Sequence, residues 1–223
     1  MKNIQINIII IILSVFTSIM INAQPYERSD YYKEKGHELI KKAGDKIKSY
    51  ESLILDFKYI VENKENNIHE SSPGKTFLKG DKFNISLDDY QYISDGNTVW
   101  TYLKDVGEIH VSYAENLEQS MNPVYLLQDF QEHYEAKLIR QENYAGELVY
   151  LVDAIPNQPQ SFFKYRTAII DETYTLSYIK AYDRHGGTYK IRIEEIHKNP
   201  TISDEKFIFD KTDYPDMDII DLR

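Results

Sequence analysis

Apolar and polar residues follow two different periods in the first third of the chain. Over residues 31–48, apolar side chains recur at spacings of three and four among charged residues, and this pattern predicts an amphipathic helix. Residues 53–62 then alternate with a period of two, and this pattern predicts a long β-strand. The apolar positions of the predicted helix are Leu39, Ile40, Ala43 and Ile47.

Shorter alternating runs continue to the end of the chain and predict further strands. Between them stand turn signals, of which Asp95-Gly96 supplies the positive φ that a tight hairpin requires. Regularly spaced short strands of this kind predict an antiparallel sheet that curls on itself. The predicted strands cover residues 83–87, 91–93, 98–104, 109–113, 148–152, 163–170, 176–182 and 189–196.

A second, shorter helix is predicted over residues 124–134, because Asn122-Pro123 supplies a cap and a first-turn proline. A curled sheet encloses a concave interior. One amphipathic helix can cover the opening of this interior but cannot fill it. The chain holds 19 tyrosines and 9 phenylalanines against one tryptophan, so the interior is expected to be apolar with scattered hydroxyl groups. These aromatic residues can pack a core or line a cavity.

The first 23 residues have the order of a secretory signal peptide: Lys2, an apolar stretch, then Ile21-Asn22-Ala23. The rival interpretation is an uncleaved anchor, since residues 4–21 could just reach across a bilayer. The sequence therefore predicts an exported protein with one domain over residues 24–223. With no cysteine, that domain has no disulfide. A net charge of −10 argues against nucleic-acid binding.

The usual signatures of enzymes and of metal or cofactor sites are missing from the sequence. The six histidines are scattered, and none has another within four positions. Asp88-Asp89 and Glu194-Glu195 are adjacent carboxylates, but neighbours in a strand point to opposite faces and cannot act as an acid–base pair. We therefore expect no catalysis, no cofactor and no metal, although carboxylates brought together from distant strands remain an open alternative.

Several short segments, in order and spacing, resemble the LolA family of periplasmic outer-membrane lipoprotein carriers, most closely its Bacteroidetes branch. The resemblance covers nearly all of residues 24–223. It is carried by residues 77–83, by Ser94-Asp95-Gly96-Asn97-Thr98-Val99-Trp100, by Asn122-Pro123 ahead of Leu126-Leu127, and by Phe207-Ile208-Phe209-Asp210, Tyr214-Pro215 and Asp221-Leu222-Arg223.

This resemblance implies a mainly β protein with helices: an incompletely closed antiparallel β-barrel of about eleven strands with an α-helical lid over an apolar cavity. It also implies a periplasmic carrier that shields the acyl chains of lipoproteins and transfers them from the inner to the outer membrane. Its partners would be the acylated lipoproteins, an inner-membrane ABC-type lipoprotein-releasing transporter, and an outer-membrane acceptor or the outer membrane itself. The predicted sheet itself favours a monomer, because a curled sheet can cover its own edges.

The resemblance further implies which residues contact the acyl chains. The lid would comprise Leu39, Ile40, Ala43 and Ile47 of the first helix together with Lys79, which falls where relatives carry a lid-closing arginine. Lysine lacks the planar fork of arginine, so its hold on the lid would be weaker. The cavity would be lined by Leu55, Phe57, Tyr59, Phe83, Ile85, Leu87, Trp100 and Tyr102.

Three points stay open from the sequence. The strand after the Asp-Gly turn could present Trp100 and Tyr102 to the cavity, or Val99, Thr101 and Leu103. The first helix contains Gly36 and Gly44, which weaken it and could either ease displacement by a ligand or permit close packing. Finally, the same fold could bind another lipid or amphiphile, or a secreted hydrolase could assemble its site from distant carboxylates.

Overall fold

The computed structural model describes residues 25–88, 90–116 and 133–223, with side chains from residue 29 onward. The predicted signal peptide lies outside the described residues. So does the second predicted helix, except at its end, where Tyr134 already begins a strand. The first predicted helix is present as α2 (Pro25–Lys48), which starts six residues earlier than its apolar pattern.

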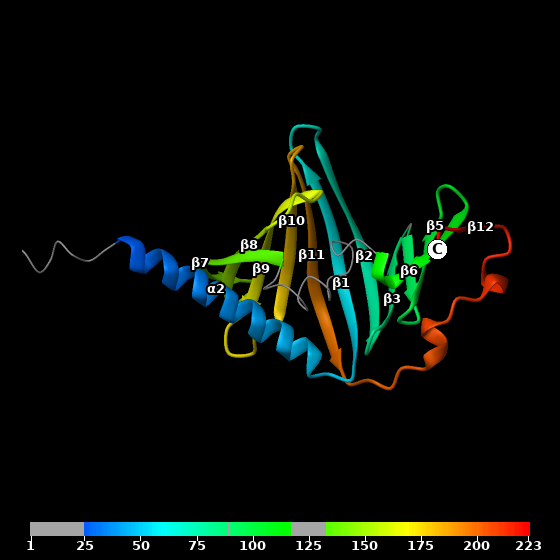
Figure 1. Cartoon of the computed structure of the whole chain (residues 1–223), viewed down its shortest axis with the longest axis horizontal. Helices are drawn as coiled ribbons and strands as arrows, with labels where there is room; N and C mark the ends of the chain where they lie inside the picture. Colours follow the sequence, from blue (N-terminus) through cyan, green and yellow to red (C-terminus); the bar gives the residue numbers. More distant parts are fainter. Residues whose placement is uncertain (1–24, 89, 117–132) are drawn as a thin grey trace, which may run out of the picture.

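Twelve strands form a single sheet that is not closed into a barrel (Figure 1). Their order is β12-β6-β5-β4-β3-β2-β1-β11-β10-β9-β8-β7, and every described pairing is antiparallel except that of β12 with β6. The strands are β1 (Ser52–Asn63), β2 (Ile68–Lys79), β3 (Lys82–Leu87), β4 (Tyr90–Ser94), β5 (Thr98–Leu103), β6 (Glu108–Tyr113), β7 (Tyr134–Tyr144), β8 (Glu147–Pro156), β9 (Phe162–Ile170), β10 (Leu176–Asp183), β11 (Gly187–Lys198) and β12 (Asp218–Asp221).

The predicted class, a mainly β open barrel with a helix, is confirmed. Three strands are absent from the runs predicted above: β2, β7 and β12. Strand β2 was missed because it contains Pro73 and Gly74, which are unusual inside strands. The neighbouring strand explains why a glycine stands at position 74. Gly74 pairs with Phe57, and a Cβ at this position would collide with the Phe57 ring.

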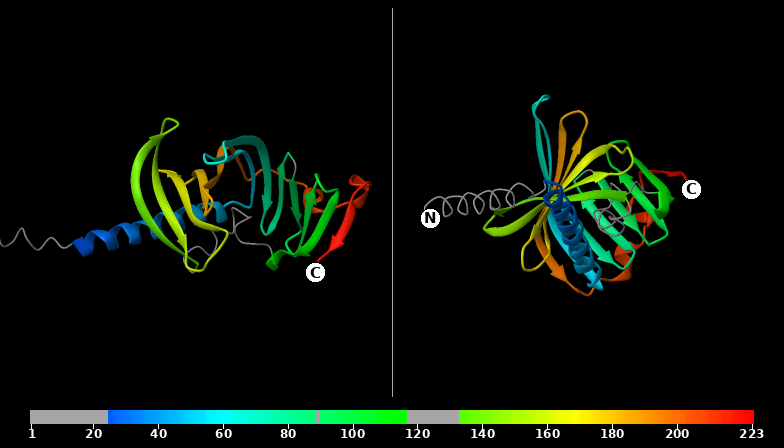
Figure 2. Two further views of the ribbon diagram at one scale, coloured as in Figure 1. Left: turned by 90° about the horizontal axis from the view of Figure 1, so that it is seen from above. Right: turned by 60° about the vertical axis from the view of Figure 1, so that its left-hand side comes forward.

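The sheet consists of two wings that meet where β1 pairs with β11 (Figure 2). One wing holds β1–β6 and β12, and the other holds β7–β11. At the junction Asp56 pairs with Glu195 but Phe57 pairs with Ile193, so Glu194 is an extra residue in a β-bulge. The bulge keeps both Ile193 and Ile196 on the inner, concave face of the sheet.

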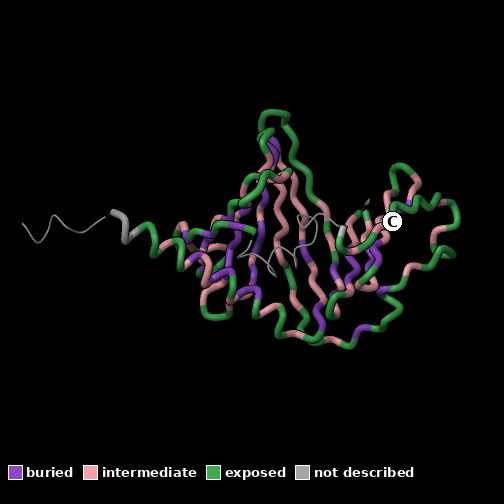
Figure 3. Tube along the Cα trace, in the orientation of Figure 1, coloured by how far each residue is buried: buried purple, intermediate pink, exposed green. Residues whose placement is uncertain are grey.

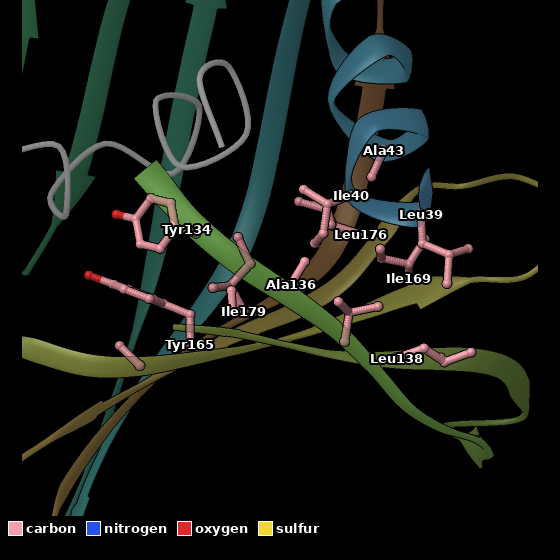
Figure 4. Packing of buried hydrophobic residues seen from close by; sticks show 13 residues of the cluster. Leu39, Ile40, Ala43, Tyr134, Ala136, Leu138, Tyr165, Ile169, Leu176 and Ile179 are labelled. Carbon is pink, nitrogen blue, oxygen red and sulfur yellow. The ribbon is translucent and has the colours of Figure 1, made fainter. Parts of the chain in front are cut away.

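Helix α2 packs against the wing of β7–β11 through its predicted apolar residues (Figure 4). Leu39, Ile40 and Ala43 have no exposed surface, and they pack with buried side chains of strands β7 to β10. Buried positions, purple in Figure 3, accordingly gather in this wing, and along β7 they alternate with exposed ones. Of the helices in the described part of the chain, none has the length and apolar character needed to cross a membrane.

The helix also covers the free edge of β7. Gly36 lies against the backbone of Lys137 and Leu138, and the His37 Nε2 atom accepts a hydrogen bond of 3.3 Å from the Ala136 N–H. An unpaired edge strand can pair with another chain, so covering it is protective. Between the two interpretations of Gly36, close packing is therefore the one that the contacts support.

Replacing Gly36 with alanine is expected to destabilise the protein, although alanine favours helix by about 1 kcal/mol. A Cβ there would lie 2.7–2.8 Å from backbone atoms of Lys137 and Leu138, and this overlap should cost about 1–3 kcal/mol. Urea denaturation measures the change. Glu34→Ala, at an exposed position of the same helix, is the control. A more stable Gly36→Ala variant would contradict this packing.

Candidate ligand-binding cavity

A cavity of about 240 Å³ lies on the concave face where the two wings meet, beside the C-terminal end of α2. Alternate residues of β1 and β11 form its floor, since their side chains share one face. The aliphatic residues of its wall are Ile47, Leu53, Leu55, Leu78, Ile85, Leu87, Leu176, Ile179, Ala181, Ile191, Ile193 and Ile196.

Aromatic residues complete the lining and bring hydroxyl groups into an otherwise apolar space. The aromatic lining residues are Tyr50, Phe57, Tyr59, Tyr92, Phe162, Tyr165 and Tyr189. Burial raises the pKa of Tyr59 to about 12 and also raises that of Tyr92. Both phenols therefore stay neutral at physiological pH, and neither introduces a negative charge into the cavity.

The structure brings six of the predicted site residues to this cavity. Leu55, Phe57 and Tyr59 line it from β1, and Ile85 and Leu87 line it from β3. The sixth is Ile47, a predicted lid residue at the end of α2. Phe83 is not among the lining residues, but it is buried in the same apolar cluster as the wall residues Leu53 and Phe57.

The rest of the predicted lid differs from the expectation. Leu39, Ile40 and Ala43 lie outside the cavity lining, because this part of α2 packs on the wing of β7–β11 and only the last turns reach the cavity. The helix pattern identifies which residues are buried, but it contains no information on which part of the sheet buries them.

Trp100 and Tyr102 also differ from the expectation, because they lie on the outer face of β5. Trp100 pairs with Ile93 and stacks on Phe209, with ring centres 5.7 Å apart, and Tyr102 contacts Tyr214 at 5.1 Å. The opposite face of the strand points inward, where Val99 is fully buried. Of the two faces left open by the sequence, the one with Val99 lies toward the interior.

The outer face of β3–β5 is contacted by the segment of residues 199–217, which crosses from β11 to β12 (Figure 1). It contains the 3-10 helices Asp204–Phe207 and Lys211–Asp213. Phe207 is 1% exposed, and the Asn84 Nδ2 donates a hydrogen bond of 2.8 Å to the Lys206 carbonyl oxygen. We call residues 199–217 the crossing segment.

Lys79 holds this crossing segment rather than α2, which corrects the predicted lid contact. Its ammonium donates to the Ile202 carbonyl oxygen at 3.3 Å and lies 3.0 Å from Asp204 Oδ1. Lys82 lies 3.3 Å from the same carboxylate oxygen. Hydrogen bonds from the two lysines lower the pKa of Asp204 below its usual value. The contact is with a backbone carbonyl near the C-terminal end of the chain, and not with the first helix.

Replacing Phe209 with alanine is expected to loosen the crossing segment, because it removes the ring stacked on both Trp100 and Tyr214. Trp100 is the single tryptophan, so its emission should shift to longer wavelength as the ring becomes hydrated. Cleavage by trypsin after Lys206 and Lys211 should also accelerate. Ile208→Ala, at a 61% exposed neighbour, is the control. An unchanged emission maximum in Phe209→Ala would contradict the stacking.

Most of the lining was missed from the sequence, including all of its residues from β2, β4, β9, β10 and β11. Ile191 and Ile193 alternate within a run predicted as a strand, but Ile196 shares their inner face only because of the bulge at Glu194, which alternation does not reveal. Lys46 and Tyr50 were missed because a charged residue and a residue just past a helix are not expected in an apolar wall. The spacing of four between them is the signal that could have identified them.

One group of residues on the outer face has the chemistry to hold a metal ion. Ligand atoms of Asp56, Glu195 and His197 all lie within 4.8 Å of one another. All three side chains are partly or largely exposed, and the Lys75 ammonium lies 2.9 Å from Asp56 Oδ1, where it already neutralises this carboxylate. The geometry therefore fits an ordinary surface ion-pair network.

The family model that describes the outer membrane lipoprotein carrier protein LolA matches residues 48–210. A comparison with curated proteins finds no match. Among solved structures, an uncharacterized conserved protein of Thermus thermophilus is similar with a TM-score of 0.56 and 9% identity, over 84% of this chain and 99% of that one.

Two further structures are similar with lower scores. A LolA superfamily protein of Nitrosomonas europaea has a TM-score of 0.43 and 10% identity, over 78% of this chain and 97% of that one. The lipoprotein LppX of Mycobacterium tuberculosis has a TM-score of 0.45 and 12% identity, over 74% of this chain and 97% of that one.

Proposed function

The chain belongs to the LolA family of outer membrane lipoprotein carrier proteins, and from this membership we propose that it carries lipoproteins by shielding their acyl chains in the cavity between its two wings. The observation that supports the proposal most directly is the lining of this cavity. Its described residues are aliphatic or aromatic apart from two threonines and one lysine, and they include no carboxylate.

Shielding is needed because exposed acyl chains are costly in water. Each methylene contributes about 0.8 kcal/mol, so a chain of roughly sixteen carbons costs on the order of 12 kcal/mol to expose. A carrier must bury most of this surface and still release the chain at its destination. The tyrosines of the lining suit both needs, since their rings are apolar and their hydroxyls make the wall less apolar than phenylalanine would.

The cavity of about 240 Å³ is smaller than the roughly 300–1,000 Å³ typical of sites that enclose a drug-sized ligand. A whole acyl chain therefore requires the wall to open. The side chains best placed to move are Ile47 and Tyr50, because they are only half-buried and lie at the end of α2, beyond its anchored part. Opening at this end would leave the packing of Leu39 and Ile40 intact.

The proposal also covers the export of the protein and the loading and delivery of the lipoprotein. Residues 1–23 direct export and are removed, and residues 24–223 act as one periplasmic, non-catalytic carrier domain. An inner-membrane transporter of the ABC type loads the lipoprotein, and an outer-membrane acceptor or the membrane itself receives it. The family match, which covers residues 48–210, supports this cycle.

The experiment that tests the proposal measures whether the purified protein keeps an acylated lipoprotein in solution. Membranes containing a radiolabelled lipoprotein are incubated with the protein and sedimented. Labelled lipoprotein in the supernatant, in a 1:1 complex with the protein, is the expected result. The same lipoprotein without acyl chains is the control, and equal binding of both forms would contradict a role for the acyl chains.

A further inference from the structure

Lys46 is the one charged side chain among the described residues that line the cavity. It belongs to the last turn of α2, one residue before Ile47 and four before Tyr50, and all three line the same end of the cavity. This end lies beside Leu53, at the start of β1. Tyr59 marks the other end, six residues and therefore about 20 Å further along the strand.

Within the described part of the chain, the Lys46 ammonium has no carboxylate within ion-pair distance. Its neighbours on the helix are engaged elsewhere: Lys41 pairs with Asp45 across the exposed surface, and Lys42 pairs with Glu38 at 2.7 Å. The ammonium instead lies over the ring of Tyr50, 5.6 Å from its centre. Lys46 is thus a half-buried cation beside an apolar wall, without a described counter-ion.

A second cation increases the positive charge at this end of the cavity. The ammonium of Lys198, at the end of β11, lies 5.9 Å from the centre of the same Tyr50 ring. Two lysines therefore flank one tyrosine where the cavity meets solvent, in a chain with a net charge of −10. An acyl chain that lies along β1 would place its polar head between these cations and its tail toward Tyr59.

We propose that this end of the cavity, through Lys46, recognises the anionic head of a single-chain amphiphile, and that the protein binds such molecules in addition to the neutral acyl groups of lipoproteins. The inference rests on the proposed function in one respect, since it requires that the cavity accept an acyl chain. The head can be a carboxylate or a phosphate, because an ammonium binds both as a point charge.

The test compares amphiphiles that share one tail and differ in their heads: hexadecanoate, hexadecyl phosphate and hexadecan-1-ol. The affinity of each amphiphile is measured by how well it displaces the neutral fluorescent probe N-phenyl-1-naphthylamine from the full-length mature chain. The pH is chosen so that both acids are ionised. The wild type is expected to bind at least one anion about fivefold more tightly than the alcohol, with this preference reduced by added salt. The anion that shows the preference identifies the head group.

Lys46→Met should reduce this preference several-fold, with Lys198 as the remaining cation, and leave the affinity for hexadecan-1-ol unchanged, because methionine keeps an apolar side chain of similar length. Lys48→Met is the matched control, since it removes the same charge from the same helical turn at an exposed position. It should keep the preference. Equal binding of the alcohol and both anions by the wild type, or an intact preference in Lys46→Met, would overturn the inference.

The same measurement separates this inference from the proposed function. If all three amphiphiles displace the probe equally, the acyl cavity stands and head recognition by Lys46 is wrong. If the probe does not bind and the acylated lipoprotein also stays with the membrane, the acyl cavity itself is wrong, and the role of Lys46 is rejected with it.

Discussion

Ile191→Glu is expected to reduce the affinity of the cavity for acyl chains by more than about 100-fold. Ile191 is half-buried, lines the cavity and pairs directly with Tyr59 across the β1–β11 junction. A carboxylate at this position has no cation among the described lining residues other than Lys46, which lies near the opposite end. An acyl chain that enters the cavity would therefore have to desolvate an unpaired charge.

The measurement is displacement of N-phenyl-1-naphthylamine by hexadecan-1-ol, combined with the retention of acylated lipoprotein in solution. Ile155→Glu is the control, because it makes the same substitution at a position of β8 that is 54% exposed and outside the cavity. This control should bind as the wild type does. If Ile191→Glu retained both activities while its circular dichroism spectrum remained that of the wild type, the acyl chain would have to bind elsewhere.

Leu39→Ala is expected to lower the free energy of unfolding by about 2–5 kcal/mol. Leu39 has no exposed surface, and its side chain packs with buried residues of β7 to β10 (Figure 4). Removing three carbon atoms leaves a cavity that the surrounding strands can fill only in part. Domains are typically stable by about 5–15 kcal/mol, so this loss would be a large fraction of the total.

Urea denaturation followed by circular dichroism measures this effect. Leu148→Ala is the matched control, since Leu148 is 47% exposed and its loss should cost less than about 0.5 kcal/mol. A cost for Leu39→Ala as small as that of the control would indicate that α2 docks loosely. That result would favour displacement of the helix by a ligand, one of the two alternatives that the sequence left open, whereas a large cost supports a fixed helix of which only the last turns move.

The local structure could be predicted from the sequence, because its causes lie within a few residues. The Asp95-Gly96 hairpin forms as predicted: Gly96 has a φ of +101°, and Asp95 Oδ1 accepts hydrogen bonds from the N–H groups of Asn97 and Thr98. The alternation of β1 likewise identifies Leu55, Phe57 and Tyr59 as one face, and the structure places this face at the cavity.

The faces of β5 and the partner of Lys79 could not be predicted from the sequence, because both depend on contacts between distant parts of the chain. The pattern of β5 is apolar on both sides, and only the stacking of Phe209 on Trp100 shows that the outer side is also covered. Lys79 lies 3.0 Å from Asp204, more than a hundred residues later. A pattern that repeats every few residues cannot reveal a contact between residues so far apart in the sequence.

The junction of β1 and β11 has a consequence for the order of folding events. Within each wing, successive strands are joined mostly by short turns, and such hairpins form in microseconds. Across the junction, Asn63 donates to the carbonyl oxygen of His185, 122 residues away, so this pairing must close a very long loop. Docking of the two wings should therefore be the slow step of refolding. Because the cavity floor consists of β1 and β11, the ability to bind an acyl chain should appear only in that last phase, after most of the β-structure has formed.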